Sequence, residues 1–241
     1  MSGNTLTIID WLTLGWFFAC WVGYNLSAKF RARSKPRLQN LAHVHIRQWI
    51  QVLHERELRI VDTSVVANME RNSTFFASSS LLIIAGLLTA IGSTDKAISF
   101  IEHLSFGAQV SQARWELGVS VLVFIYVYAF FTFTWTMRQW GLASILIGSA
   151  QQSDDLQASD AERDRHRESL AQLVWLAIYN FNLGLRGYYF SLALLIWFVF
   201  PLGVVLTTLW VIAVLYRREF HSRTVKALRV GLEQWEPEDD R

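Results

Sequence analysis

The longest uncharged stretch of the chain limits its fold more than any other feature. Residues Tyr188–Tyr216 run for 29 residues without a charged side chain, and shorter uncharged stretches precede them at Trp11–Ala28, Thr74–Gly92 and Leu117–Met137. About 20 apolar residues at a rise of 1.5 Å each span the roughly 30 Å hydrocarbon core of a bilayer. The sequence therefore predicts an all-α integral membrane bundle of four transmembrane helices, over about 8–28, 73–92, 115–137 and 188–216.

Composition supports this prediction and narrows the chemistry. Apolar residues make up 52% of the chain, and no segment shows the alternation of apolar and polar residues that a transmembrane barrel requires. The single cysteine, Cys20, lies inside the first predicted span, which excludes an intrachain disulfide.

The distribution of Lys and Arg predicts the orientation of the spans. The connection over 27–71 holds nine basic residues and four acids, so we expect it in the cytoplasm and the N-terminus outside. Four spans would then leave the basic segment 217–229 outside, against this rule. Two alternatives resolve the conflict: a fifth span over Leu170–Leu185 that turns at Arg186–Gly187, or a bend of the last stretch at Pro201. Each half of the last stretch is too short to cross alone, so we expect a kink at Pro201 and not a hairpin.

Two amphipathic helices are predicted on the cytoplasmic side. Apolar residues recur at near-helical spacing from Leu38, with charged residues between them and no Pro or Gly from Arg37 to Gly86. This pattern predicts a helix over about 38–71 that runs on into the second span. A second amphipathic helix is predicted over about 158–186, with Asp160 as a possible cap.

Four runs of residues resemble a known family. They are Arg59-Ile-Val-Asp62, Arg71-Asn-Ser-Thr-Phe-Phe-Ala-Ser-Ser-Ser80, Gly184-Leu-Arg-Gly-Tyr-Tyr-Phe-Ser-Leu-Ala193 and Leu215-Tyr-Arg-Arg-Glu-Phe220. Together they resemble signature runs of a bacterial membrane protein family of unknown function, DUF599, over about Trp11 to Arg223. The resemblance implies a multi-pass protein of the bacterial inner membrane, and it implies no activity or catalytic residue.

The polar entry to the second span is the main candidate site. Asn72, Ser73, Thr74 and Ser78 place small polar side chains at the start of an apolar helix. Small hydroxyl residues favour close helix packing, or they line a water-filled path or a head-group pocket.

Three arginines are candidates for binding an anion or a lipid head group. Arg71, Arg138 and Arg186 are expected near the cytoplasmic boundary, where basic side chains usually reach lipid phosphate. Asp10 lies near the outer end of the first span, and we expect its carboxylate to reach water.

No motif for catalysis, a metal or a cofactor is found. The chain has no nucleophile elbow, phosphate-binding glycine loop, dinucleotide fingerprint or zinc-protease motif. His43 and His45 are two residues apart and therefore lie on different faces of a helix. The formal net charge of +2 and the position of the basic segments beside spans favour anionic lipid over nucleic acid as a partner.

Three functions from different classes follow as hypotheses. The first is a homo-oligomeric channel-like or transport-like protein, suggested by the polar face of the second span. The second is an accessory or scaffold protein that binds a partner through the helix over 38–71. The third is a membrane enzyme acting on lipid head groups through the three arginines.

Overall fold

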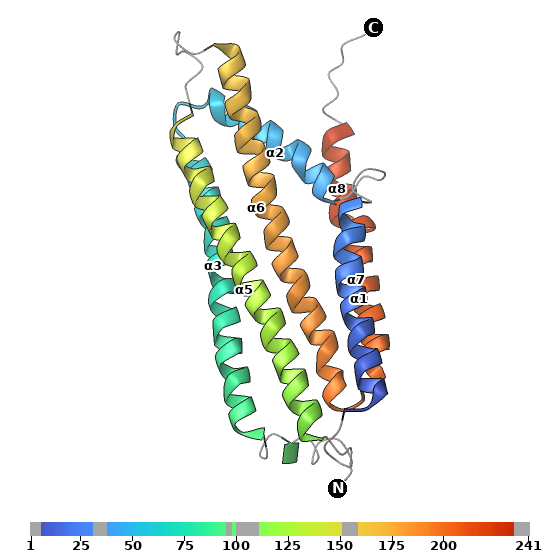
Figure 1. Ribbon diagram of the computed structural model, residues 1–241. Coiled ribbons are helices and arrows are strands. Elements are labelled where there is room, and N and C mark those ends of the chain that lie inside the picture. The colour runs from blue at the N-terminus through green and yellow to red at the C-terminus, as the bar shows by residue number, and fades with distance from the viewer. Residues whose placement is uncertain (1–5, 31–37, 95–97, 100–110, 151–158, 234–241) are drawn as a thin grey trace. The chain divides into compact units, whose positions relative to one another are not determined.

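The computed structural model describes residues 6–30, 38–94, 98–99, 111–150 and 159–233. These residues form helices and no strand (Figure 1). The helices are α1 (Ile8–Phe30), α2 (Leu38–Glu55), α3 (Ile60–Gly92), α5 (Gln112–Gly148), α6 (Asp160–Leu194), the short 3₁₀ helix η2 (Leu195–Phe198), α7 (Gly203–Phe220) and α8 (Arg223–Glu233).

The chain divides into two compact units that share the long helices. Unit 1 comprises residues 1–29, 73–134 and 181–213, and unit 2 comprises residues 30–72, 135–180 and 214–241. Unit 1 thus contains parts of α1, α3, α5, α6 and α7. Unit 2 contains α2, α8 and the remaining parts of α3, α5, α6 and α7.

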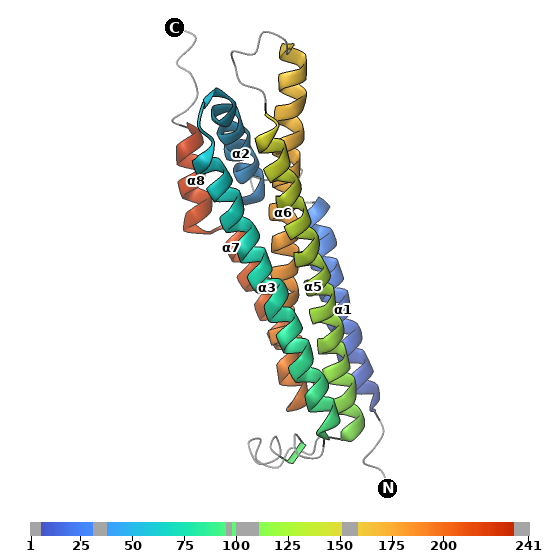
Figure 2. The same ribbon diagram turned by 90° about the vertical axis from the view of Figure 1, so that its left-hand side faces the viewer.

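Aromatic side chains fill the interior of unit 1. In this unit α3 and α5 lie side by side (Figure 2), with the rings of Phe76 and Phe133 stacked 5.3 Å apart. Phe181 and Tyr188 of α6 meet the same two rings at 5.6–5.9 Å. Offset and edge-to-face contacts of this kind add about 0.5–1.5 kcal/mol per pair beyond the area they bury.

A glycine allows α6 to approach this aromatic cluster closely. A Cβ atom added at Gly184 would lie 2.6 Å from Cζ of Phe133. Any larger residue would overlap that ring, so the packing of α6 on α5 requires glycine here.

The chain reverses direction within the longest uncharged stretch. α6 ends at Leu194 and η2 at Phe198, and α7 begins at Gly203 and returns along α6. The hydroxyl of Thr207 in α7 donates to the carbonyl of Ala193 in α6 at 2.9 Å. Pro201 favours this reversal because proline lacks an amide hydrogen and restricts the residue before it.

This reversal corrects two sequence predictions. The single span over 188–216, kinked at Pro201, is wrong because the stretch is divided between two antiparallel helices. The alternative turn at Arg186–Gly187 is also wrong, because α6 is continuous through both residues. Residues 188–194 of this stretch continue the helix formed by residues 160–187, which gives one helix of 35 residues. The predicted amphipathic helix over 158–186 is the first part of that helix.

Unit 2 has its own aliphatic core, built where α2, α5 and α6 meet. Its buried members recur every three or four residues along each helix, as in Ile46, Ile50 and Leu53 of α2 and Leu170, Val174 and Ala177 of α6. Burying a side chain of the size of Leu or Ile contributes about 1.5–3 kcal/mol. Unit 2 therefore has an apolar core of its own.

The predicted helix over 38–71 is interrupted, which is a further correction. α2 ends at Glu55 and α3 begins at Ile60. Long-range polar contacts hold the corner: Arg59 donates to the carbonyl of Ile147 at 3.2 Å and to that of Ala150, both at the end of α5. No Pro or Gly marks this break, so the sequence pattern does not show it.

Two described helices, α3 and α5, are long and apolar enough to cross a bilayer. They differ in how far the rest of the chain covers them. In the most apolar segment of α3 11% of the residues are buried, against 44% in α5. α3 is therefore the more exposed of the two apolar helices.

Candidate functional site

The predicted polar entry of α3 is divided between the inside and the outside of the molecule. Ser73 is fully buried, whereas Asn72, Thr74 and Ser78 are exposed. Thr74 and Ser78 are four residues apart and so lie on one face of the helix. The same face carries Leu82, which is 75% exposed. The exposed surface of α3 is thus polar at its start and apolar beyond.

The buried hydroxyl groups farther along α3 have partners inside unit 1. Ser80 lies 3.0 Å from the hydroxyl of Tyr188, which donates to the carbonyl of Phe76 at 3.1 Å. Ser191 donates to the hydroxyl of Tyr126 at 2.9 Å. These hydroxyls satisfy one another within the helix packing, which fits the packing interpretation of the serines in this region.

Arg186 is the most unusual of the three candidate arginines because it is 2% exposed. It lies on α6, two residues beyond Gly184. Its guanidinium donates to Oδ1 of Asn25 at 3.3 Å and lies 5.3 Å from the centre of the Tyr24 ring. Arginine over an aromatic face is stabilised by the ring quadrupole, by about 2 kcal/mol or more where water is excluded.

Arg186 is buried in a unit that contains few charged residues. Unit 1 contains four of the chain's 22 basic residues, namely Lys29, Lys96, Arg114 and Arg186, and unit 2 contains the other 18. The four acidic residues of unit 1 are Asp10, Asp95, Glu102 and Glu116. All of these except Arg186 lie near helix ends or in the connection between α3 and α5. Among the described residues of unit 1, Arg186 is therefore the one charged residue in the middle of a helix segment.

Arg71 and Arg138 have different surroundings from Arg186. Both are exposed, and both belong to unit 2. Their positions suit the expected role of basic side chains that reach outward to phosphate. A single site formed by the three arginines stays a prediction.

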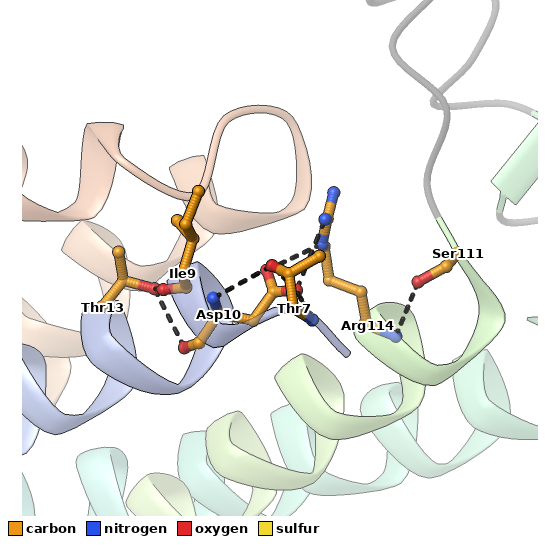
Figure 3. Close-up of polar contacts among 6 residues, drawn as sticks. All are labelled: Thr7, Ile9, Asp10, Thr13, Ser111 and Arg114. Carbon is orange, nitrogen blue, oxygen red and sulfur yellow. Dashed lines mark hydrogen bonds and ion pairs between the residues drawn. The ribbon is translucent and has the colours of Figure 1, made fainter. Parts of the chain in front are cut away.

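Asp10 forms a buried ion pair that the sequence analysis did not anticipate (Figure 3). The carboxylate is 1% exposed and accepts from Nε of Arg114 at 3.0 Å. The amide and hydroxyl of Thr7 also donate to it, at 2.9 and 2.8 Å, which caps the start of α1. The expectation that this carboxylate reaches water is wrong, because Arg114 at the start of α5 covers it.

Unit 2 contains a second group of buried polar residues at the corner between α2 and α3. Asp62 is fully buried and accepts from Nε1 of Trp49 at 2.7 Å and from Arg56 at 3.0 Å. His54 and His166 lie beside each other, with Nε2 of His54 3.2 Å from Nδ1 of His166. Arg59 and Asp62 form one of the signature runs, and both stabilise this corner.

Burial lowers the pKa of both histidines, which favours their neutral forms. Burial is the main cause for His54, the hydrogen bond to the carbonyl of Ile50 opposes this lowering of the pKa, and the nearby Arg167 and Arg59 add to it. Burial and Arg59 likewise lower the pKa of His166. Among the described residues no group of three or more His, Cys, Asp or Glu side chains is arranged to hold a metal ion.

Several of these residues could not be found from sequence patterns. Asn25 belongs to no motif in the sequence, and its partner Arg186 is 161 positions away. His54 and His166 are 112 positions apart. The two members of each pair meet only because of the tertiary fold.

The comparisons with known proteins identify a family and nothing closer. A family model described as "Protein of unknown function, DUF599" matches residues 12–224. No curated protein and no solved structure matches the chain.

Proposed function

The chain belongs to the DUF599 family, and we propose that it is a multi-pass protein of the bacterial inner membrane that acts as a homo-oligomeric channel-like or transport-like protein. Two apolar helices support the membrane location. The main observation behind the multi-pass proposal is the unequal number of charged residues in the two units.

Unit 1 is the membrane-embedded part in this proposal. It holds eight of the 42 charged residues of the chain, and the start of its α3 segment, Ser73, is also the start of the predicted second span. Charged side chains are rare in hydrocarbon because each carries a penalty of at least about 2.5–3.5 kcal/mol at the centre of a bilayer. Unit 2, which holds most of the charge, lies in the cytoplasm.

Five helices, α1, α3, α5, α6 and α7, then cross the membrane. The reversal between η2 and α7 supports the fifth crossing and brings the C-terminal segment to the cytoplasmic side. Arg217 and Arg218 belong to the same unit as the basic connection 30–72. The positive-inside rule, which a four-span arrangement breaks, holds for five crossings.

The exposed surface of α3 supports assembly into a homo-oligomer. Thr74 and Ser78 lie on its outer face together with Phe75, which is 65% exposed. Small hydroxyl residues favour close approach of helices in a membrane, and hydrogen bonds between them contribute about 0.6–2 kcal/mol. Because aromatic rings fill the interior of unit 1, a path for solutes would lie between copies and would be lined by α3.

The test combines copy number with flux. We expect native mass spectrometry of the protein released from nanodiscs to give three or more copies. We also expect proteoliposomes to pass a small ion, and the pair T74V and S78A to reduce both properties. The matched control is T89V on the same helix, where the hydroxyl of Thr89 bonds to the carbonyl of Ala85 in its own helix. A monomer that passes no ion would overturn the proposal.

A second function is favoured by an exposed apolar corner of unit 2. Leu58, Ile60 and Val61 lie where α2 meets α3 and are 65–74% exposed. Such a patch on a polar unit is typical of a protein-binding surface, and it supports an accessory or scaffold role. Co-purification of the wild type and of a variant with L58D and V61D distinguishes this role, since loss of a partner without loss of copy number would favour it.

A further inference from the structure

Unit 1 has an apolar groove between α1 and α5, which we call the α1–α5 groove. Its volume is about 640 Å³, within the usual range of ligand-binding sites. Its lining residues are Phe18, Trp21, Val22, Asn25, Leu26, Phe124 and Tyr128. Asn25 is the one side-chain amide among them.

Asn25 connects this groove to the buried cation. Its Oδ1 atom accepts from Nη1 of Arg186 at 3.3 Å. Arginine only donates hydrogen bonds, so the amide oxygen faces Arg186 and the amide nitrogen is available as a donor for another group. The groove thus has one side-chain amide among its lining residues, and this amide is hydrogen-bonded to a buried cation.

The dimensions of the groove suit a hydrocarbon chain. Phe18 and Leu26 are eight residues apart on α1, which corresponds to roughly 12 Å along the helix axis. Asn25 lies five residues before the end of α1 at Phe30, or roughly 7–8 Å from it. A chain lying in the groove would therefore have its polar end about a turn and a half below the end of α1.

We propose that the α1–α5 groove binds one acyl chain of an anionic phospholipid of the cytoplasmic leaflet, with the lipid's phosphate or ester oxygens at Asn25. This inference rests on the membrane location proposed for unit 1. Charge complementarity selects the anionic lipid. Arg186 supplies a positive field at Asn25, because its guanidinium donates to Oδ1 of that residue at 3.3 Å. Basic residues near a membrane surface attract anionic lipid.

The test uses nanodiscs of equal parts phosphatidylcholine and phosphatidylglycerol. Native mass spectrometry of the released protein counts the lipids that each chain retains. We expect the wild type to retain one phosphatidylglycerol about fivefold more often than phosphatidylcholine, the ratio that corresponds to about 1 kcal/mol. V22W fills the groove, and we expect it to lose the retained lipid. N25L removes the amide but keeps Arg186, and we expect it to retain a lipid with a smaller preference for phosphatidylglycerol than the wild type.

The matched control is L12W, which adds the same ring to an exposed position of α1 outside the groove. It should retain phosphatidylglycerol like the wild type. Equal retention of both lipids by the wild type, unchanged in V22W, would overturn the proposal and indicate annular lipid. A change of copy number in V22W without a change in retained lipid would overturn it in favour of a second chain in the groove. Failure of the membrane location itself would show separately, as protein that is washed from membranes by alkaline carbonate.

Discussion

At the scale of single residues, the ion pair between Asp10 and Arg114 connects the starts of two helices of unit 1. We expect D10N to destabilise the protein, because Arg114 would keep its charge in a partly buried position without a carboxylate. Removing one partner of a buried pair costs about 3–5 kcal/mol, and less is expected here because the Arg114 side chain is 19% exposed.

Chemical unfolding in detergent measures this loss. R114M combined with D10N should restore part of it, so a double-mutant cycle should give a coupling of about 1–3 kcal/mol. E116Q is the control, since it removes a carboxylate from α5 that accepts from Gln112 of the same helix. Additive effects of D10N and R114M would contradict the pairing.

The pair of His54 and His166 predicts a loss of stability in acid. Both pKa values are lowered from their ordinary value of 6.5 in the folded protein, chiefly by burial. As the pH falls below about 6.5, the unfolded chain binds protons that the folded unit 2 does not, so the free energy of unfolding decreases. The contribution of the two histidines to the free energy of unfolding is fully present above about pH 6.5. It is lost as the pH falls toward their lowered pKa values.

We expect the melting temperature in detergent to fall between about pH 7.5 and about pH 5.5, and to fall less in H166Q. Glutamine can still donate to His54 but carries no titrating group. H221Q, at an exposed position of unit 2, is the control and should melt like the wild type at both pH values. The same acid-induced decrease in H166Q and the wild type would exclude this pair as its cause.

At the scale of elements, the contact between α5 and α6 depends on a glycine. We expect G184A to destabilise the protein by about 1–3 kcal/mol, because the added Cβ would overlap the ring of Phe133. The gain of up to about 1 kcal/mol in helix propensity offsets only part of this.

G86A is the matched control because a Cβ at Gly86 of α3 has no atom within 4 Å. It should be neutral or slightly stabilising in the same unfolding measurement. Shortening the opposing ring with F133L should partly rescue G184A. Equal melting temperatures for G184A and G86A would mean that α6 does not pack this closely on α5.

At the scale of the whole molecule, the prediction concerns the side of the membrane that the C-terminus occupies. Five crossings place it in the cytoplasm, so green fluorescent protein fused there should fluoresce and alkaline phosphatase fused there should be inactive. Phosphatase inserted after Gly92, at the end of α3, should be active and serves as the control. An active phosphatase at the C-terminus would restore the four-span arrangement.

The helical fold class could be predicted from the sequence, whereas the contacts between distant residues could not. The apolar stretches predicted helices close to α1, α3 and α5, because hydrophobicity and helix length are properties of neighbouring residues. The candidate site could be predicted from the sequence only in part. Arg186 was found as a candidate, but its burial and its partner Asn25 were not, since nothing near Arg186 in the sequence indicates what faces it.

The sequence alone determined the helical class, the apolar segments and the basic segments that flank them, since each depends on residue type along a local stretch. Tertiary structure decided where the chain reverses and breaks. Pro201 permits either a kink or a hairpin, and the return of α7 along α6 selects the hairpin. The break between α2 and α3 has no local breaker and depends on contacts of Arg59 with residues about 90 positions away. Such choices depend on contacts between distant parts of the chain, and those contacts exist only after folding.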